Sequence, residues 1–120
     1  MAATVADYAV LSDSIVTLEI GHDIDHTFPF TLPSNLNRDL SAVMTLQMEA
    51  EKPSSLKWQM DVNGTVIMTF VHSTDRFCAL QEVFGAGILK VGANNATVKV
   101  LSGSGQLKVS DIVALFQVNV

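Results

Sequence analysis

The sequence is poor in the features that mark several classes of protein. Among its 120 residues there is one cysteine, Cys78, so no disulfide can form within the chain. We expect Cys78 to pack as a small apolar side chain. Charged residues make up 16% of the chain, against about 25% in a typical globular protein. The seven basic residues form no cluster and the net charge is −5, which argues against nucleic-acid and anionic-membrane partners.

Long apolar runs are also missing. No run approaches about 18 residues, so the sequence predicts no membrane span. The first eight residues lack a basic region followed by an apolar one, and we expect no signal peptide there. These observations leave the cellular compartment open.

Motifs for catalysis are absent too. The sequence has no Gly-x-Ser-x-Gly elbow, no phosphate-binding loop and no paired-cysteine zinc site. No pair of carboxylates stands out as the pair that a glycosidase needs. We therefore expect a protein that is not an enzyme.

Aromatic residues are only 7% of the chain, so no strong platform for stacking on a ligand is visible. Trp58 shares its phase with Leu56 and Met60, which predicts a place in the core. Tyr8, Phe28 and Phe30 are candidates for partial exposure.

What the sequence does contain is apolar alternation with period two, interrupted by polar turns. It predicts one all-β domain over residues 1–120, a two-sheet antiparallel β-sandwich of jelly-roll type with about eight or nine strands. The expected strands are 5–10, 14–20, 27–32, 41–50, 56–62, 65–71, 76–83, 97–101 and 106–120. Segment 41–50 is the main ambiguity, since its Met, Leu, Ala and Glu residues favour helix while its period favours strand.

Several turns carry local signals. Asn63-Gly64 between two alternating segments predicts a type I′ hairpin turn, because both residues tolerate positive φ. It also begins a glycosylation triplet, as does Asn95, but the turn explains Asn63-Gly64 better. Residues 51–55 and 102–105 are expected to be turns. A change of phase near Ser110-Asp111 predicts a β-bulge.

Residues 62–66 and 87–98, with the order Asn-Gly hairpin, strand and then Leu-Lys-x-Gly-x-Asn, resemble the galactose-binding-like jelly rolls, to which many carbohydrate-binding modules belong. The tail 103–115 resembles their last strands. This resemblance covers roughly residues 56–120. It implies a sandwich fold, a carbohydrate ligand and, in many members, a structural calcium ion. Asp111 takes the acidic position that the resemblance implies for calcium, and Glu19 is the nearest upstream partner. Calcium prefers six to eight oxygen ligands, and an Asp111 that caps a bulge is the alternative.

Alternation of antiparallel strands places the loops 21–26, 51–55, 72–75 and 102–105 at one end of the sandwich. This end gathers the three histidines with several charged residues, and loops on a rigid sandwich commonly bind ligands. The predicted ligand-binding residues are His22, Asp23, Asp25, His26, His72, Asp75 and Arg76. Chelation of zinc by His22 and His26, or a plain solvated loop, are the other interpretations of the first cluster.

Two functions follow from these observations. The first is a non-catalytic, lectin-like module that recognises carbohydrate through the end loops. The second is a structural or assembly protein, a homo-oligomer that self-associates through a low-charge sheet face or edge. The partner is accordingly a carbohydrate or another protein.

Overall fold

A computed structural model of the chain describes residues 3–120 and shows an all-β protein. Seven antiparallel strands are joined in one hydrogen-bonded sheet that folds over on itself, and one short 3₁₀ helix lies in the connection between β6 and β7. The elements are β1 Thr4–Ser12, β2 Val16–Glu19, β3 Asp25–Leu32, β4 Ser41–Val62, β5 Thr65–His72, β6 Arg76–Gly85, η1 Ala86–Ile88 and β7 Gly92–Asn119. Within this part of the chain, no helix is long and apolar enough to cross a membrane.

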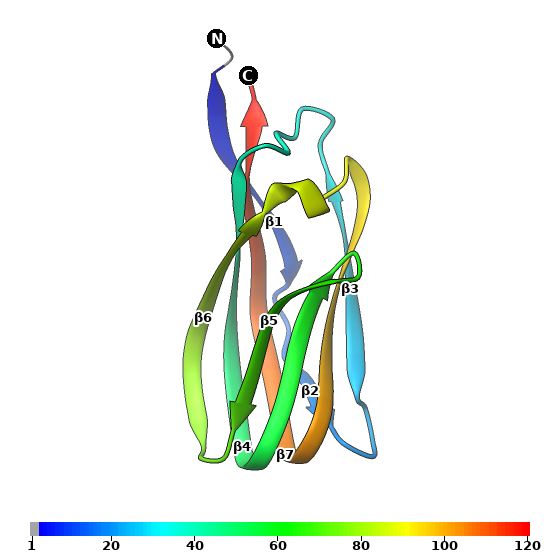
Figure 1. Cartoon of the computed structure of the whole chain (residues 1–120), viewed down its shortest axis with the longest axis vertical. Coiled ribbons are helices and arrows are strands. Elements are labelled where there is room, and N and C mark those ends of the chain that lie inside the picture. Colours follow the sequence, from blue (N-terminus) through cyan, green and yellow to red (C-terminus); the bar gives the residue numbers. More distant parts are fainter. Residues whose placement is uncertain (1–2) are drawn as a thin grey trace.

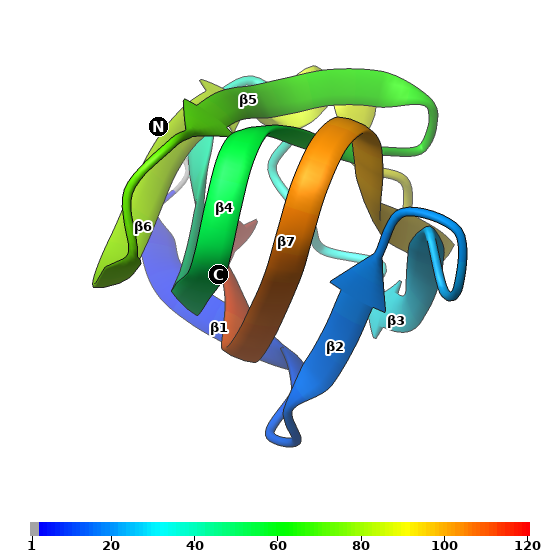
Figure 2. The same ribbon diagram turned by 90° about the horizontal axis from the view of Figure 1, so that it is seen from below.

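The two longest strands, β4 and β7, pair with each other and form the centre of the fold. Both bend back sharply at one end of the molecule (Figure 1), and the view from that end shows the two bends side by side (Figure 2). Residues 41–50 of β4 pair with β6, whereas residues 56–62 pair with β5. Likewise, the first part of β7 pairs with β3 and the last part with β2 and β1.

The bends divide the sheet into two layers with the core between them. Layer 1 consists of β6, the first half of β4, the last half of β7, and an edge formed by β2 and β1, which lie end to end along β7. Layer 2 consists of β5, the second half of β4, the first half of β7, and β3. The predicted all-β sandwich is confirmed.

The strand count differs from the prediction because two expected turns are bends within continuous strands. Segments 51–55 and 102–105 belong to β4 and β7, so four expected strands merge into two. In β4 the bend uses positive φ angles at Lys52 (49°) and Ser55 (47°). In β7 it uses Gly103 (87°) and Gly105 (107°), where glycine adopts such angles without strain.

The core follows the alternation expected along β4. Every second side chain from Ala42 to Ala50, and again from Leu56 to Val62, is buried, which confirms that 41–50 is strand rather than helix. Trp58 is fully buried, as predicted. Tyr8 is exposed, but Phe28 and Phe30 are buried, so their expected partial exposure is wrong. Their side chains lie on the inward face of β3, in phase with Leu32.

Two local predictions are also confirmed. Asn63 and Gly64 both have positive φ, at 51° and 87°, as a type I′ turn requires. The registers Thr45↔Val113 and Gln47↔Ser110 leave two β7 residues opposite one β4 residue, which is a β-bulge at Asp111.

Candidate functional site

The predicted end loops do share one end of the molecule. The β2–β3 turn, the β5–β6 turn and both bends lie together there (Figure 1). However, β4 and β7 separate the two turns, because β2 and β3 pair with β7 while β5 and β6 pair with β4. With strands about 4.8 Å apart, three spacings place the turns about 14 Å from each other. The seven predicted ligand-binding residues therefore form two groups rather than one cluster.

The first group lies in and beside the β2–β3 turn, where His22, Asp23, Asp25 and His26 are all exposed. Backbone bonds hold this turn: the amide of Glu19 donates to the carbonyl of Asp23 at 2.8 Å, and that of His22 to the carbonyl of Glu19 at 3.1 Å. The ring of His26 packs against that of Phe28, with 4.6 Å between centroids. The turn is well fixed, and its polar side chains face solvent.

In the second group, His72 has a structural partner. Trp58 donates from Nε1 to Nε2 of His72 at 2.9 Å, and the His72 ring stacks on Phe70 with 6.1 Å between centroids. Burial, with a smaller contribution from the charge of Arg76, lowers the pKa of His72 below its usual 6.5. The His72 imidazole is therefore engaged with the core.

Asp75 is engaged as well. Its Oδ1 accepts a hydrogen bond from the amide of Lys52 at 2.8 Å, and Ser73 Oγ accepts one from the amide of Ser55 at 3.0 Å. Both donors lie at the bend of β4, where the backbone has left its regular ladder. The β5–β6 turn thus ties down the bend, and Arg76 beside it has an exposed side chain.

The two predicted calcium ligands do not meet. Glu19 lies opposite Gln106 on β7, and Asp111 is five residues further along that strand. At about 3.3 Å per residue this separation is about 16 Å, too long for one ion to bridge. Over residues 3–120 there is also no group of three or more His, Cys, Asp or Glu side chains arranged to hold a metal. Asp111 instead has a φ of 51° at the bulge.

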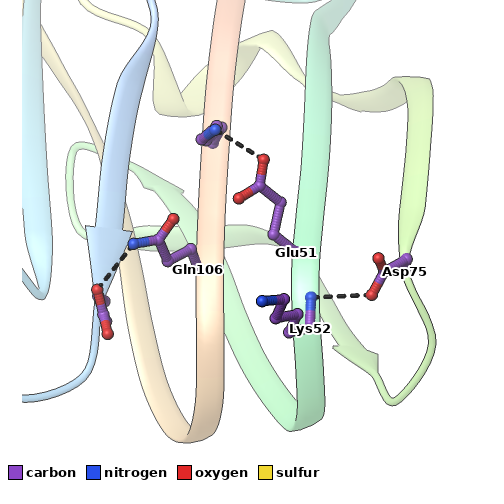
Figure 3. Close-up of polar contacts among 6 residues, drawn as sticks. Glu51, Lys52, Asp75 and Gln106 are labelled. Atoms are coloured by element: carbon purple, nitrogen blue, oxygen red, sulfur yellow. Dashed lines mark hydrogen bonds and ion pairs between the residues drawn. The ribbon is translucent and has the colours of Figure 1, made fainter.

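Polar contacts cross layer 1 next to the bends. Gln106 donates to Glu19 at 3.1 Å, and Lys108 Nζ lies 2.7 Å from Glu51 Oε1. Gln106, Glu51, Lys52 and Asp75 follow one another across this end from β7 to the β5–β6 turn (Figure 3). The bond from Lys108 lowers the pKa of Glu51, and the same bond raises the pKa of Lys108. This row holds acceptors and a cation in solvent-accessible positions.

Directly beside this row is a surface that the sequence analysis missed. Here polar side chains of β4 and β7 lie next to the aromatic ring of Phe77. Glu49 is opposite both Phe77 and Lys108, and Gln47 is opposite both Ala79 and Ser110. Phe77 is 75% exposed, and Ile15 at the other side is 69% exposed. Between them lies a shallow depression. We call this surface the Phe77 face; it consists of Ile15, Gln47, Glu49, Phe77, Lys108 and Ser110.

The Phe77 face continues on both sides. A neighbouring hollow is lined by Glu49, Phe77, Asp75 and Arg76, so two of the predicted ligand-binding residues adjoin it. Beyond the bulge, the outward side of layer 1 becomes apolar, with Val83, Val43, Leu115 and Tyr8 in one row across four strands. Layer 1 thus has a polar half next to the bends and an apolar half away from them.

No protein-family model matches the sequence, and no curated protein matches it. Solved structures do match. A part of dimeric latent PorU from Porphyromonas gingivalis aligns with a TM-score of 0.79 and 11% identity, over 97% of this chain and 13% of that one. A β-porphyranase of glycoside hydrolase family 86 from Bacteroides plebeius aligns with a TM-score of 0.64 and 20% identity, over 99% of this chain and 21% of the enzyme. The chain therefore spans only a small part of either protein.

Carbohydrate-binding modules match over more than 90% of both chains. A family 35 module from an environmental isolate has a TM-score of 0.54 and 11% identity, covering 98% of this chain and 97% of the module. A family 29 module from Piromyces equi has a TM-score of 0.51 and 13% identity, covering 92% and 91%. At such identities the likeness concerns fold. The chain has a β-sandwich fold similar to that of carbohydrate-binding modules, as the resemblance in its sequence implies.

Proposed function

We propose that the chain is a non-catalytic carbohydrate-binding module and that its glycan lies on the Phe77 face. The observation that carries this proposal is the exposed Phe77 ring beside Glu49, Lys108 and Gln47. One side of a sugar ring presents C–H groups that pack on an aromatic face, while its hydroxyls bond to carboxylates, amides and ammonium groups. This surface offers both kinds of contact within one shallow depression.

The similar structures support a carbohydrate ligand. Two of them are carbohydrate-binding modules, and a third is a β-porphyranase. A further similar structure, of BuGH86, is a complex with neoagarooctaose; it aligns with a TM-score of 0.61 and 18% identity, over 96% of this chain and 19% of that one. Galactans of the porphyran and agarose type are therefore the first ligands to test.

A glycosidase activity fits the face less well. Glu49 and Glu51 lie two residues apart on the same side of β4, a spacing close to that of a catalytic pair. However, a general acid needs a raised pKa, and the bond from Lys108 lowers the pKa of Glu51. The pair sits on an open sheet surface that admits water freely. We therefore assign these carboxylates to hydrogen bonding with sugar hydroxyls.

Titration calorimetry with neoagarooctaose and soluble porphyran, alongside a β-glucan, tests the proposal. We expect a galactan to bind and Phe77→Ala to abolish that binding. Folding should be preserved, because exposed substitutions usually change stability by no more than about 0.5 kcal/mol. Val71→Ala, at a 60% exposed position on β5, is the matched control and should bind as wild type does.

A further variant distinguishes the Phe77 face from the β2–β3 turn, which lies at the same end of the molecule. If the joint change Asp25→Ala and His26→Ala removes binding while Phe77→Ala does not, the ligand lies at the β2–β3 turn. In that case the Phe77 face is the wrong site. If wild-type protein binds none of a wide panel of glycans on an array, the function itself is wrong.

A further inference from the structure

The edges of the two layers differ in how well they are protected against pairing with another strand. An edge strand presents a row of unpaired N–H and C=O groups to which a further strand can be added. Layer 1 ends in β6 on one side and in β1 and β2 on the other. Layer 2 ends in β5 and β3. These four edges are the places where a partner strand could attach.

Three of the edges carry interruptions. Pro29 lies in the middle of β3 and cannot donate a hydrogen bond. In β5 the registers Met60↔Met68 and Asp61↔Val66 leave an extra residue, which is a bulge that bends the strand. The β1–β2 edge is broken between its two strands, and β1 has its own register shift.

Strand β6 has none of these interruptions. Its ten residues pair with β4 without a register shift, from Ser41↔Gly85 to Ala50↔Arg76. It contains no proline, and its only charged residues are Arg76 and Glu82. Among residues 3–120 nothing pairs with its other edge, and Figure 2 shows it at the outside of the fold. β6 is thus an open edge, regular and long enough to accept another strand.

The two charged residues of β6 would complement those of a second copy of the strand. When two copies run antiparallel with Ala79 opposite Ala79, Arg76 of each copy lies opposite Glu82 of the other. Cys78 then faces Leu80, and Phe77 faces Gln81. Within the described chain, the one ion pair closer than 4.0 Å joins Lys108 and Glu51, so both β6 charges are free to pair across such an axis. Opposite charges that face each other stabilise a strand pair and fix its register.

A groove beside this edge fits the same arrangement. It lies between β5 and β6 and is lined in part by Phe70, His72, Cys78 and Leu80. Cys78 and Leu80 are half-buried and pack against the core. A second β6 strand would lay its own Cys78 and Leu80 alongside, on the same side of the extended sheet, and would cover apolar surface that is now open.

We propose that two copies of the chain associate through β6, antiparallel and centred on Ala79, so that layer 1 continues from one copy into the other. The proposal is independent of glycan binding. Its seven paired residues, 76–82, bury less surface than the roughly 1,600 Å² of a standard interface, so the dimer dissociates on dilution. The two Phe77 faces would lie on one continuous surface.

Sedimentation velocity of the full chain, at concentrations up to about 1 mM, tests this dimer. We expect a reversible monomer–dimer equilibrium. Arg76→Glu and Glu82→Arg each place like charges opposite each other twice and should weaken association about tenfold. The double variant Arg76→Glu with Glu82→Arg restores the opposite charges and should recover the dimer. Lys57→Glu, the same charge change on the exposed outer side of layer 2, is the matched control.

Ala79→Lys adds an independent measurement, because two ammonium groups would meet at the symmetry axis and prevent association. A chain that stays monomeric throughout the concentration range overturns the proposal. So does a dimer that the single charge reversals leave unchanged, or a double variant that fails to recover. Because sedimentation reports association between chains and no sugar is present, none of these results bears on whether the monomer binds sugar.

Discussion

Asn94 and Asn63 join two distant parts of layer 2 through their side chains. Asn63 donates from Nδ2 to Oδ1 of Asn94 at 2.9 Å and to the carbonyl of Ile88 at 2.8 Å. The same Oδ1 accepts from the amide of Lys90 at 2.8 Å, and Nδ2 of Asn94 donates to the carbonyls of Lys90 and Gly92. Asn94 is 2% exposed. This network fixes the segment after η1 to the β4–β5 hairpin.

Replacing Asn94 should therefore destabilise the fold. Asn94→Ala removes the four bonds that its side chain makes and leaves part-buried partners without them, which we expect to lower the free energy of unfolding by about 1–3 kcal/mol. Asn94→Asp keeps the acceptor but turns a carboxylate oxygen toward two carbonyls, and should also destabilise. Urea unfolding measures both, with Asn95→Ala at the exposed neighbour as control. Equal stability of the two alanine variants would contradict the role of Asn94.

Two glycines with the same φ test whether the bends of β4 and β7 are in close contact. Gly64 and Gly103 both have a φ of 87°, but a Cβ at Gly64 meets open space while one at Gly103 would lie 2.1 Å from the carbonyl oxygen of Ser55. Gly64→Ala should cost about 1–2 kcal/mol for the left-handed backbone alone. Gly103→Ala should cost about 1–3 kcal/mol more, because the bends of β4 and β7 must move apart. Thermal unfolding compares them, and an equal loss would show that the bends are not in close contact.

Much of this fold could be predicted from period-two alternation. Trp58 is in phase with its neighbours on β4, and Asn63-Gly64 specifies its turn locally. The continuity of β4 through 51–55 could not be predicted, because the positive φ of Lys52 and Ser55 has no sequence signal. That bend depends on tertiary contacts, including the bonds from Asp75 and Ser73.

The candidate site was harder to predict for two reasons. Alternation shows that Phe77, Ala79 and Gln81 share one side of β6, but both sides of that strand mix apolar and polar residues, so the exposed side is not evident. Alternation also shows which loops share an end, yet not their lateral order. That order depends on which strands β4 and β7 take as partners, and it separates His22 from His72.

The Trp58–His72 contact makes stability depend on pH. An indole N–H can only donate, so Nε2 of His72 must be unprotonated to accept it. The pKa of His72 is lowered in the folded protein, while in the unfolded chain it stays near 6.5. Below about pH 6.5 the unfolded chain takes up the proton more readily than the folded one. The contribution of His72 is therefore complete above that pH and decreases as the pH falls toward the lower, folded pKa.

Two substitutions isolate this contribution. His72→Gln offers a carbonyl oxygen to Trp58 but does not titrate. Between about pH 7.5 and pH 5.5 the free energy of unfolding of this variant should therefore decrease less than that of wild type. His72→Leu leaves the Trp58 donor without a partner at every pH, and should be less stable than the Gln variant by about 1–3 kcal/mol even at pH 7.5. Urea unfolding across this range measures both effects. Parallel pH profiles for wild type and His72→Gln would mean that protonation of His72 does not disturb the contact with Trp58.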